Sequence, residues 1–350
     1  MKRTRTIIVT GGSGFVGSAL IEYWRNQYPA DQVVNCDRLQ SRSPEAAMPH
    51  ESQTRQHRLV HVQADVCDYR AMCALLASFR PAYVVHCAAQ ASTQMGISHP
   101  SLTFSNNVIG TQTVLEAIRQ SGVPTHFHYV STYLVYGDAG AGDSLERLTE
   151  HSFCKAVNPY SASKAAAEQV VMAYYGSFRT KSTISRSSNN YGPYPQSWGV
   201  IPRFVAQALL RQPLVIHGDG RQSRDWVHVR DHCRAIDRIL TRGTVGGIYN
   251  VGSNCEVSVE ELADTIISII DPSGGSKVHV AQDHGRERRC KLDWDLIRRE
   301  LRWKPAEDFS TSFRETVEWY RHHGEALSPH SGTDRQPRND GRAESVLEAC

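Results

Sequence analysis

Two side chains four residues apart have the chemistry needed to take a proton from an alcohol. Tyr160 and Lys164 form the pattern YxxxK, and residues at this spacing share one face of a helix. A tyrosine with a pKa of about 10 is a poor base at neutral pH, but a lysine ammonium one turn away, together with the positive charge of a bound cofactor, would lower that pKa. Taken alone, YxxxK is also common on solvated helix faces. Ser131 and Thr132 add weight, because they end an expected strand upstream and offer a hydroxyl to the same substrate oxygen.

A glycine-rich turn could hold the phosphates of a dinucleotide. Gly11, Gly14 and Gly17 form GxxGxxG directly after an apolar run and at the start of an amphipathic stretch. Such glycines permit a tight turn, close approach of the backbone to a diphosphate, and close packing of helix on strand. Asp37 ends the next apolar run, where a carboxylate accepts a hydrogen bond from a ribose 2′-hydroxyl and favours NAD. Arg38 beside it could accommodate the 2′-phosphate of NADP, so that alternative stays open.

Two further strand ends are candidates for contact with the same cofactor. Asp65 and Val66 close a third apolar run and could meet the adenine; alternatively, Asp65 caps the helix that begins near Asp68. Ala88 and Ala89 follow a fourth run, where small residues let the backbone lie along a cofactor. The alternative for these alanines is close packing alone.

The hydrophobic pattern of the first half supplies a scaffold for these residues. Short apolar runs alternate with helix-like segments. The expected strands are 7–10, 33–36, 59–62, 82–86 and 126–130, and the expected helices lie within 13–27, 69–79 and 105–120. This alternation predicts an α/β fold with a doubly wound parallel sheet covered by helices on both faces.

The second half is less regular, with prolines and glycines that mark loops. The elements expected there are strands at 214–216 and 248–251 and helices at 258–270 and 310–322. Ser258 and Glu261 form a capping box at the start of the first of these helices. The polar segment 38–58 is expected to be a flexible loop. The segment 324–350 has few large apolar residues and is expected to be a disordered tail.

These elements predict two domains. Residues 1–186 form the cofactor domain, to which 225–255 contribute, and residues 187–322 form most of a smaller α/β substrate domain.

Composition excludes several classes of protein. The 350 residues include 39 Lys and Arg and 36 Asp and Glu, and a net charge of +3 is too small to imply a nucleic-acid partner. No apolar run approaches the roughly 18 to 20 residues that span a bilayer, so we expect no membrane partner. Nine cysteines without CxxC predict neither a disulfide framework nor a zinc site and fit a reducing cytoplasm. We expect no metal site.

Together, the motifs resemble one enzyme family over residues 5–322. The sequence TGGSGFVG at 10–17, the Ser-Thr strand end followed by Val-Tyr-Gly, and YxxxK are similar to the extended short-chain dehydrogenase/reductase family. The segments 189–194 (NNYGPY), 224–226 (RDW) and 286–289 (RERR) resemble its nucleotide-sugar branch, above all the dTDP-glucose 4,6-dehydratases. The resemblance implies a Rossmann domain that binds NAD and a smaller domain that binds an NDP-sugar.

The same resemblance implies a homodimer formed through helices at about 103–120 and 158–178. The sequence itself shows only that these segments are amphipathic, which fits a monomer equally well.

The resemblance also assigns roles to particular residues. It implies Thr132, Tyr160 and Lys164 as the catalytic triad. The residues expected to contact NAD are Gly11, Gly14, Phe15, Val16, Gly17, Asp37, Asp65, Val66, Ala88, Ala89, Asn107, Tyr160 and Lys164. The residues expected to contact a dTDP- or UDP-hexose are Gln90, Tyr133, Asn190, Arg224, Asn250 and Arg288. A guanidinium fork matches phosphate oxygens, although a single arginine is as often part of a surface ion pair.

Three segments depart from the dehydratase pattern. Dehydratases carry an Asp-Glu pair directly after the catalytic Thr, which protonates the leaving 6-hydroxyl and removes the proton at C5. Here those positions are Tyr133 and Leu134, and the segments 91–95 and 195–199 also differ. Because the hydride-transfer residues are intact, we predict an NAD-dependent NDP-sugar epimerase that acts through a transient 4-keto sugar.

Two alternatives stay open. A 4,6-dehydratase or a related lyase, including a decarboxylase, would need Tyr133, His151 or Cys154 to replace the missing acid and base. A non-catalytic protein that binds NAD or an NDP-sugar is the other alternative, and the intact triad argues against it.

Overall fold

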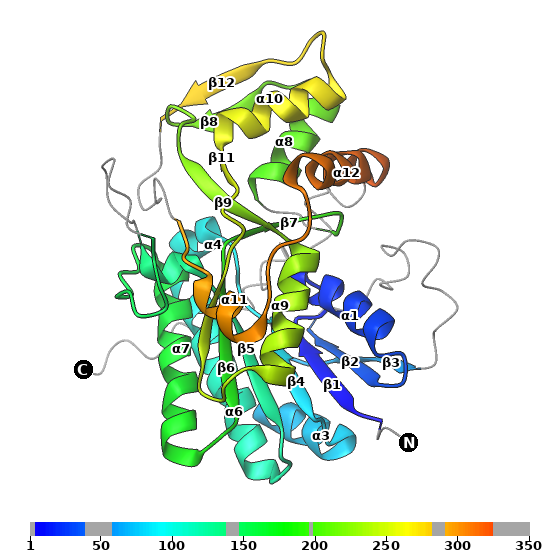
Figure 1. The fold of residues 1–350 in the computed structure, drawn as a ribbon, viewed down its shortest axis with the longest axis vertical. Coiled ribbons are helices and arrows are strands. Elements are labelled where there is room, and N and C mark those ends of the chain that lie inside the picture. Colours follow the sequence, from blue (N-terminus) through cyan, green and yellow to red (C-terminus); the bar gives the residue numbers. More distant parts are fainter. Residues whose placement is uncertain (1–3, 39–57, 138–146, 196–198, 282–290, 325–350) are drawn as a thin grey trace, which may run out of the picture.

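A seven-stranded parallel sheet forms the larger lobe of the computed structural model, which describes residues 4–38, 58–137, 147–195, 199–281 and 291–324 (Figure 1). Its strands are β1 (Thr6–Thr10), β2 (Gln32–Asp37), β3 (Leu59–Gln63), β4 (Tyr83–His86), β5 (His126–Thr132), β6 (Ser182–Ser187) and β10 (Ile248–Val251). Their spatial order is β10-β6-β5-β4-β1-β2-β3. The order reverses between β1 and β4, and doubly wound sheets bind ligands at such a switch point. The predicted α/β fold class is confirmed.

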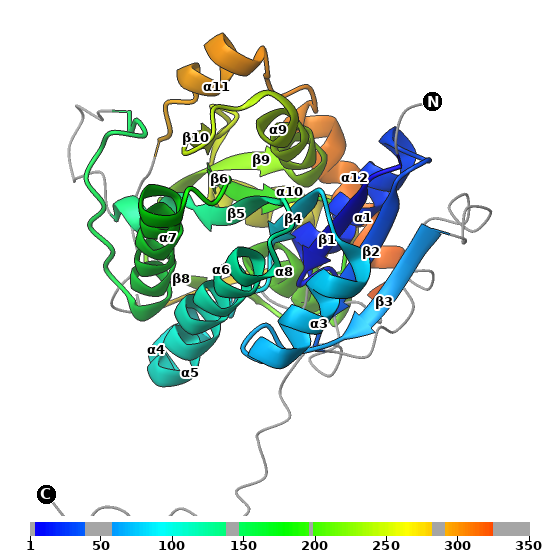
Figure 2. The same cartoon turned by 90° about the horizontal axis from the view of Figure 1, so that it is seen from below.

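Helices cover both faces of this sheet (Figure 2). On one face lie α3 (Tyr69–Phe79), α6 (Gly110–Ser121) and α7 (Pro159–Phe178), and on the other lie α1 (Phe15–Gln27) and α9 (Val229–Arg242), with α11 (Asp295–Leu301) against α9. Successive residues of a strand therefore enter different cores. Ile8 packs in the core with α3 and α6, whereas Ile7 packs in the core with α1 and α9, and neither has exposed surface.

The smaller lobe contains short sheets packed against helices (Figure 1). Its strands are β7 (Asn189–Tyr191), β8 (Leu214–His217), β9 (Ser223–His228), β11 (Glu256–Ser258) and β12 (Lys277–Val280), and its helices are α8 (Val200–Leu209), α10 (Val259–Ile270) and α12 (Phe309–His322). Phe204, Leu262 and Phe313 lie in its core. Ser258 and Glu261 form the predicted capping box at the start of α10, so that prediction is confirmed.

The two lobes are interleaved along the chain. Between β9 and β11, the helix α9 and the strand β10 return to the larger lobe, and α11 does so again before α12. The region 225–255 thus supplies α9 and β10 to the larger lobe. The domain boundaries themselves stay predictions.

Short helical segments connect β4 to α6. They are α4 (Thr93–Ser98), α5 (Pro100–Phe104) and the π-helical turn η2 (Ser105–Ile109). The helix predicted over 105–120 therefore begins with a π-helical turn, a geometry that is frequent at functional sites.

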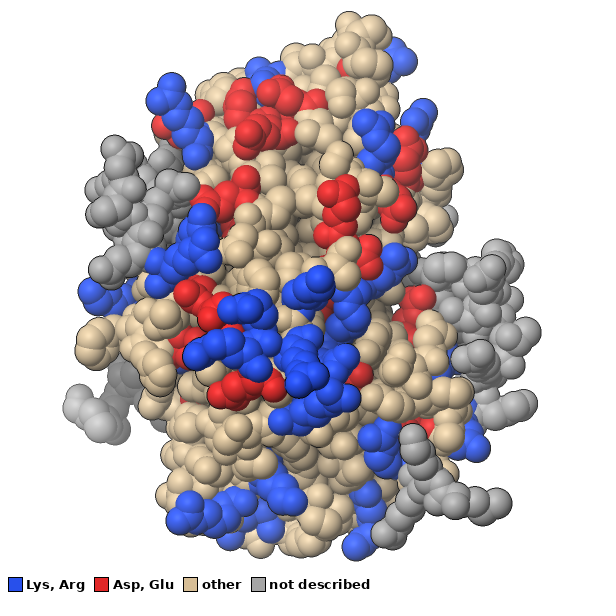
Figure 3. Space-filling model, viewed as in Figure 1, with Lys and Arg blue, Asp and Glu red and all other residues tan. Residues whose placement is uncertain are grey.

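Basic side chains gather on one face of the molecule, over α9 and α11 (Figure 3). Helix α9 alone carries Arg234, Arg238 and Arg242 at intervals of four residues. Within the described ranges, no helix is long and apolar enough to cross a bilayer. Nearly all of the loop predicted over 38–58, the tail after residue 324, and Arg288 lie outside the described residues.

Candidate active site

The glycine turn is pressed against the end of β4, at the switch point of the sheet. Gly11 has φ +69°, and a Cβ there would lie 2.5 Å from the backbone nitrogen of Ala88. A Cβ on Gly17 would lie 2.3 Å from the carbonyl oxygen of Gly11, so α1 packs directly on the turn. Gly14 occupies the N-cap of α1 and offers no side-chain cap. The first N–H groups of the helix are therefore suited to an anion such as a diphosphate.

A carboxylate stands beside this turn. Asp37 ends β2, and its Oδ2 accepts a hydrogen bond from the backbone nitrogen of Ser13 at 3.0 Å. A backbone cradle that only glycine can form, with a carboxylate at the end of the second strand, fits the diphosphate and ribose of NAD.

The structure shows which residue after β3 caps the helix α3. Asp68 caps α3 by accepting from the backbone nitrogen of Ala71 at 3.0 Å, so the alternative role of Asp65 as that cap is wrong. Asp65 is exposed; its side chain accepts from the backbone nitrogen of Cys67, and its carbonyl oxygen accepts from that of Asp68. Val66 is buried against Gly110 of α6. The contacts of Asp65 and Val66 with adenine stay predictions.

Asn107 holds the loop that follows β4. Its Oδ1 accepts from the backbone nitrogen of Gln90 at 2.7 Å, and its Nδ2 donates to the carbonyl oxygen of Gln90 and to Oγ of Ser163 on α7. The side chain is 1% exposed. Asn107 therefore fixes the backbone that carries Ala88 and Ala89 relative to α7, and a direct contact with NAD stays a prediction.

Helix α7 places the YxxxK pair inside the protein. Asn158 and Ser161 form a capping box at its first turn, so Tyr160 follows a fixed helix start. Tyr160 is 8% exposed and Lys164 is 3% exposed. The ammonium of Lys164 donates to the carbonyl oxygen of Val130 at 2.7 Å and lies over the ring of Tyr129.

Burial shifts the pKa values of Tyr160 and Lys164 in opposite directions. It raises the pKa of Tyr160 well above its ordinary value. It lowers the pKa of Lys164 to about 8, against the attraction of Glu168 and Cys87. In the protein alone, desolvation disfavours the tyrosinate. The expectation that Lys164 and a positively charged nicotinamide together lower the pKa of Tyr160 stays a prediction.

Thr132 ends β5 beside this pair, and an apolar segment follows it. Its Oγ1 accepts from the backbone nitrogen of Leu134 at 3.3 Å and starts the short helix η3 (Tyr133–Tyr136). Tyr133 is 4% exposed and packs in a cluster with Val135 and Leu292. The positions that carry the acid and base in dehydratases therefore hold a buried ring and a leucine. The predicted substrate contact of Tyr133 stays a prediction.

A buried ion pair behind the triad was not predicted from the sequence. Glu168 lies one turn beyond Lys164 on α7 and pairs with Arg186 of β6 at 2.6 Å, with both side chains at most 4% exposed. Ser131 donates to the same carboxylate at 2.5 Å, and Arg186 donates to the hydroxyl of Tyr136 at 2.9 Å. The spacing of Tyr160, Lys164 and Glu168 at intervals of four was the signal available in the sequence.

Asn250 extends this network through the hydroxyl of Tyr136. It has no exposed surface, and its Oδ1 accepts from the Tyr136 hydroxyl at 2.7 Å. Its Nδ2 donates to the carbonyl oxygens of Leu148 and Asp293. The amide of Asn250 holds neighbouring segments together, and its predicted contact with the substrate stays a prediction.

Two other predicted substrate residues lie on the three-stranded sheet of the smaller lobe. Asn190 of β7 and Arg224 of β9 belong to adjacent strands of one small sheet. Their contacts with a substrate stay predictions, as does that of Gln90.

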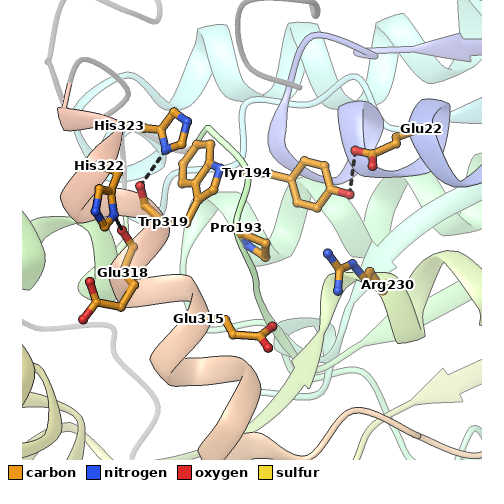
Figure 4. Close-up of a pocket in the computed structure, with 9 residues that line it drawn as sticks. All are labelled: Glu22, Pro193, Tyr194, Arg230, Glu315, Glu318, Trp319, His322 and His323. Atoms are coloured by element: carbon orange, nitrogen blue, oxygen red, sulfur yellow. Dashed lines mark hydrogen bonds between the residues drawn. The ribbon is translucent and has the colours of Figure 1, made fainter. Parts of the chain in front are cut away.

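A cavity of about 410 Å³ lies elsewhere, between α1, the loop before α8, α9 and α12 (Figure 4). It is lined by Glu22, Pro193, Tyr194, Arg230, Glu315, Glu318, Trp319, His322 and His323. Tyr194 donates to Glu22 at 2.9 Å across it. None of the residues predicted to bind cofactor or substrate lines this cavity. Among the described residues, no group of three or more His, Cys, Asp or Glu side chains could hold a metal ion.

A doubly wound sheet with a glycine turn at its switch point and a buried YxxxK pair defines the class of short-chain dehydrogenases/reductases. Within it, the chain belongs to the NAD dependent epimerase/dehydratase family, whose profile matches residues 7–252. The predicted family and its NAD cofactor are confirmed at this level.

The relatives act on nucleotide sugars. The chain is 36% identical over 335 residues to a dTDP-glucose 4,6-dehydratase of Shigella flexneri, covering 90% of this chain and 92% of the relative. A solved dTDP-glucose 4,6-dehydratase of Streptomyces venezuelae, with NAD bound, matches with a TM-score of 0.84 and 34% identity over 93% of this chain and 99% of that one. A UDP-glucose 4-epimerase of Thermotoga maritima matches with a TM-score of 0.81 and 26% identity over 91% and 99%.

Proposed function

We propose that the protein is an NAD-dependent nucleotide-sugar epimerase that inverts a carbon of a dTDP- or UDP-hexose through a transient 4-keto sugar. The observation that carries this proposal is the segment after Thr132. Leu134 cannot transfer a proton, and Tyr133 is 4% exposed in an apolar cluster. Epimerisation needs no acid or base at C5 and C6, whereas 4,6-elimination needs both.

The remaining residues suffice for reversible oxidation of a hydroxyl. The glycine turn, the N-terminus of α1 and Asp37 would hold NAD, which supplies a hydride acceptor when bound. Tyr160 takes the proton of the sugar hydroxyl, Thr132 bonds the same oxygen, and the positive charge of Lys164 stabilises the tyrosinate. Hydride returned from the reduced cofactor to the opposite face of the ketose would invert the carbon.

The relatives favour a second candidate, a 4,6-dehydratase or a related lyase with other acid and base groups. Cys154 is exposed and its sulfur accepts from Nη2 of Arg186 at 3.6 Å. Burial nevertheless raises the pKa of this thiol, which makes it a poor base.

One experiment separates these functions. The purified protein is incubated in D₂O with dTDP- and UDP-linked glucose, galactose and glucuronate, and the sugar is followed by NMR. A C4-inverted sugar without deuterium on its ring carbons supports the epimerase. A 4-keto-6-deoxy sugar that carries deuterium at C5 would show the dehydratase, and a pentose would show a decarboxylase. If the protein binds NAD but turns over none of these sugars, the result would support the non-catalytic binding protein.

We also propose a homodimer in the cytoplasm. Apolar side chains are exposed beside α6 and α7, namely Ile97, Leu102, Phe104, Ile109 and Phe178. A patch of this kind favours association. The seven described cysteines are free thiols, which suits a reducing compartment. Light scattering of the purified chain measures the oligomeric state.

A further inference from the structure

A chain of hydrogen bonds runs through the core beside β5 and β6 and ends at Asn190. Its links have lengths of 3.0, 3.0, 3.1, 3.3 and 3.0 Å. In order, its members are His126, Thr183, His128, Ser185, His232 and Asn190. All but the last are buried. This series of hydrogen bonds runs from the larger lobe to Asn190 on β7, where a substrate contact is predicted.

The direction of donation along this series of hydrogen bonds is fixed at Asn190. Its amide nitrogen donates to the carbonyl oxygen of Ser188 at 3.1 Å, and a carbonyl only accepts, so the amide cannot be reversed. Its Oδ1 therefore faces Nδ1 of His232, which must donate. Burial lowers the pKa of His232 to about 3, so the ring is neutral and its Nε2 carries no proton.

Every other link follows from this one. Ser185 must donate to the bare Nε2 of His232, so its oxygen accepts from Nε2 of His128. The Nδ1 of His128 is then an acceptor, to which Thr183 donates. Thr183 in turn accepts from Nε2 of His126. All donors point toward Asn190, and this one assignment satisfies every link.

Among the described residues, Asn190 keeps one hydrogen-bonding position without a partner. Both hydrogens of its amide nitrogen are used, by Oγ of Ser187 and the carbonyl oxygen of Ser188. Its Oδ1 has two lone pairs, and His232 uses one of them. The second lone pair can accept a hydrogen bond from a hydroxyl but cannot bind a phosphate oxygen.

We propose that His232 is a positioning residue that presents Asn190 as a hydrogen-bond acceptor for a hydroxyl of the nucleotide sugar. This inference rests on the proposed function, because it takes the ligand at β7 to be a nucleotide sugar. It assigns Asn190 to a sugar or ribose hydroxyl.

Two variants of similar size separate this role from a structural one. In His232→Asn, the amide nitrogen takes the place of Nδ1 and keeps the donor to Asn190. In His232→Gln, the amide reaches toward Ser185 and the donor to Asn190 is lost. We expect His232→Gln to raise KM for the nucleotide sugar about tenfold with kcat unchanged, and His232→Asn to keep KM within about twofold. Thermal unfolding shows that both variants fold. Equal KM values in the two variants, or a loss in kcat alone, would overturn the proposal.

Imidazole ¹⁵N spectra test the chain without any substrate. We expect the proton on Nδ1 in His232 and on Nε2 in His126 and His128. A proton on Nε2 of His232 would overturn the proposal even if the sugar is turned over. If the tautomers are as expected but isothermal titration detects no binding of any nucleotide sugar, the proposed function fails and the role of His232 fails with it.

Discussion

Tyr160 and Lys164 are tuned by the same physical cause, the loss of water. Desolvation disfavours the charged form of either group, so it keeps the phenol of Tyr160 neutral and weakens the hold of Lys164 on its proton. A positive charge brought next to Tyr160 acts strongly in such a setting, because the local dielectric is low. The pair is therefore poised to respond to a bound cation such as an oxidised nicotinamide.

Removing the hydroxyl of Tyr160 should abolish most of the activity. We expect Tyr160→Phe to lower kcat for sugar turnover by about 100-fold or more, because the general base is lost while the ring is retained. The measurement is the initial rate by NMR, with NAD affinity and melting temperature as controls for folding. Full activity in this variant would show that the triad assignment is wrong.

The buried amine of Lys164 should leave a mark on stability as a function of pH. Its pKa falls from 10.5 to about 8 on folding, so between these pH values the unfolded chain binds more protons than the folded protein. The free energy of unfolding of the wild type should therefore rise with pH across this window, by about 3 kcal/mol relative to Lys164→Met. Urea unfolding from pH 7 to 10.5 measures both proteins. Parallel profiles would contradict a lowered pKa.

At the scale of elements, the ion pair of Glu168 and Arg186 joins α7 to β6. We expect Glu168→Gln to lower the free energy of unfolding by about 3 kcal/mol, because it leaves the Arg186 charge buried without a counterion. The matched control is Asp264→Asn, which removes the exposed partner of Lys277 and should cost less than about 1 kcal/mol. Chemical denaturation of both variants decides the matter, and equal losses would refute the argument.

The turn between β1 and α1 should tolerate no side chain at Gly11. Gly11 and Gly122 have similar φ angles, +69° and +62°, but only Gly11 has backbone atoms where a Cβ would stand. We expect Gly122→Ala to cost about 1 kcal/mol from strain alone. Gly11→Ala should cost more and weaken NAD binding about tenfold or more, since Ala88 must move. Calorimetric titration with NAD tests the pair; unchanged affinity in Gly11→Ala would place NAD away from this turn.

The apolar strands were predictable and the polar ones were not. β1, β2, β4 and β5 read as runs of large apolar residues, and each lies within a residue or two of its expected place. β6 was not predicted, because five of its six residues are Ser, Thr or Arg, although every one of the six is buried. Thr183, Ser185 and Arg186 find partners on β5, α9 and α7, and a sequence does not show which residues so far along the chain will be partners.

Some residues of the candidate site were likewise predictable from the sequence and others were not. Local spacing identified the glycine turn and the YxxxK pair, because both motifs act within one turn of a helix. The positions of Asn107 and Asn250 depend on long-range hydrogen bonds, to Gln90 in one case and to Tyr136 in the other. Their amides hold the protein together, which the residue type alone does not distinguish from ligand binding.

At the scale of the whole molecule, a net charge of +3 conceals an uneven surface. Arginines of α9 and α11 form a basic face (Figure 3), yet several of them are paired, as Arg298 is with Asp295. Such exposed pairs contribute little to stability. The charge that matters for a sugar nucleotide is local, as at Asp37 on β2 and Arg224 on β9.

The arrangement in two lobes predicts that cofactor and substrate binding can be weakened separately. Asp37 ends β2 of the larger lobe, and Arg224 lies on β9 of the smaller lobe. We expect Asp37→Asn to weaken NAD binding about tenfold with KM for the sugar nucleotide nearly unchanged. We expect Arg224→Gln to raise that KM about tenfold or more and leave NAD affinity unchanged, because it removes a charged donor from the substrate alone. Calorimetry gives the first quantity and initial rates give the second. If Arg224→Gln instead weakened NAD binding, β9 would belong to the cofactor site, and the division of labour between the lobes would be wrong.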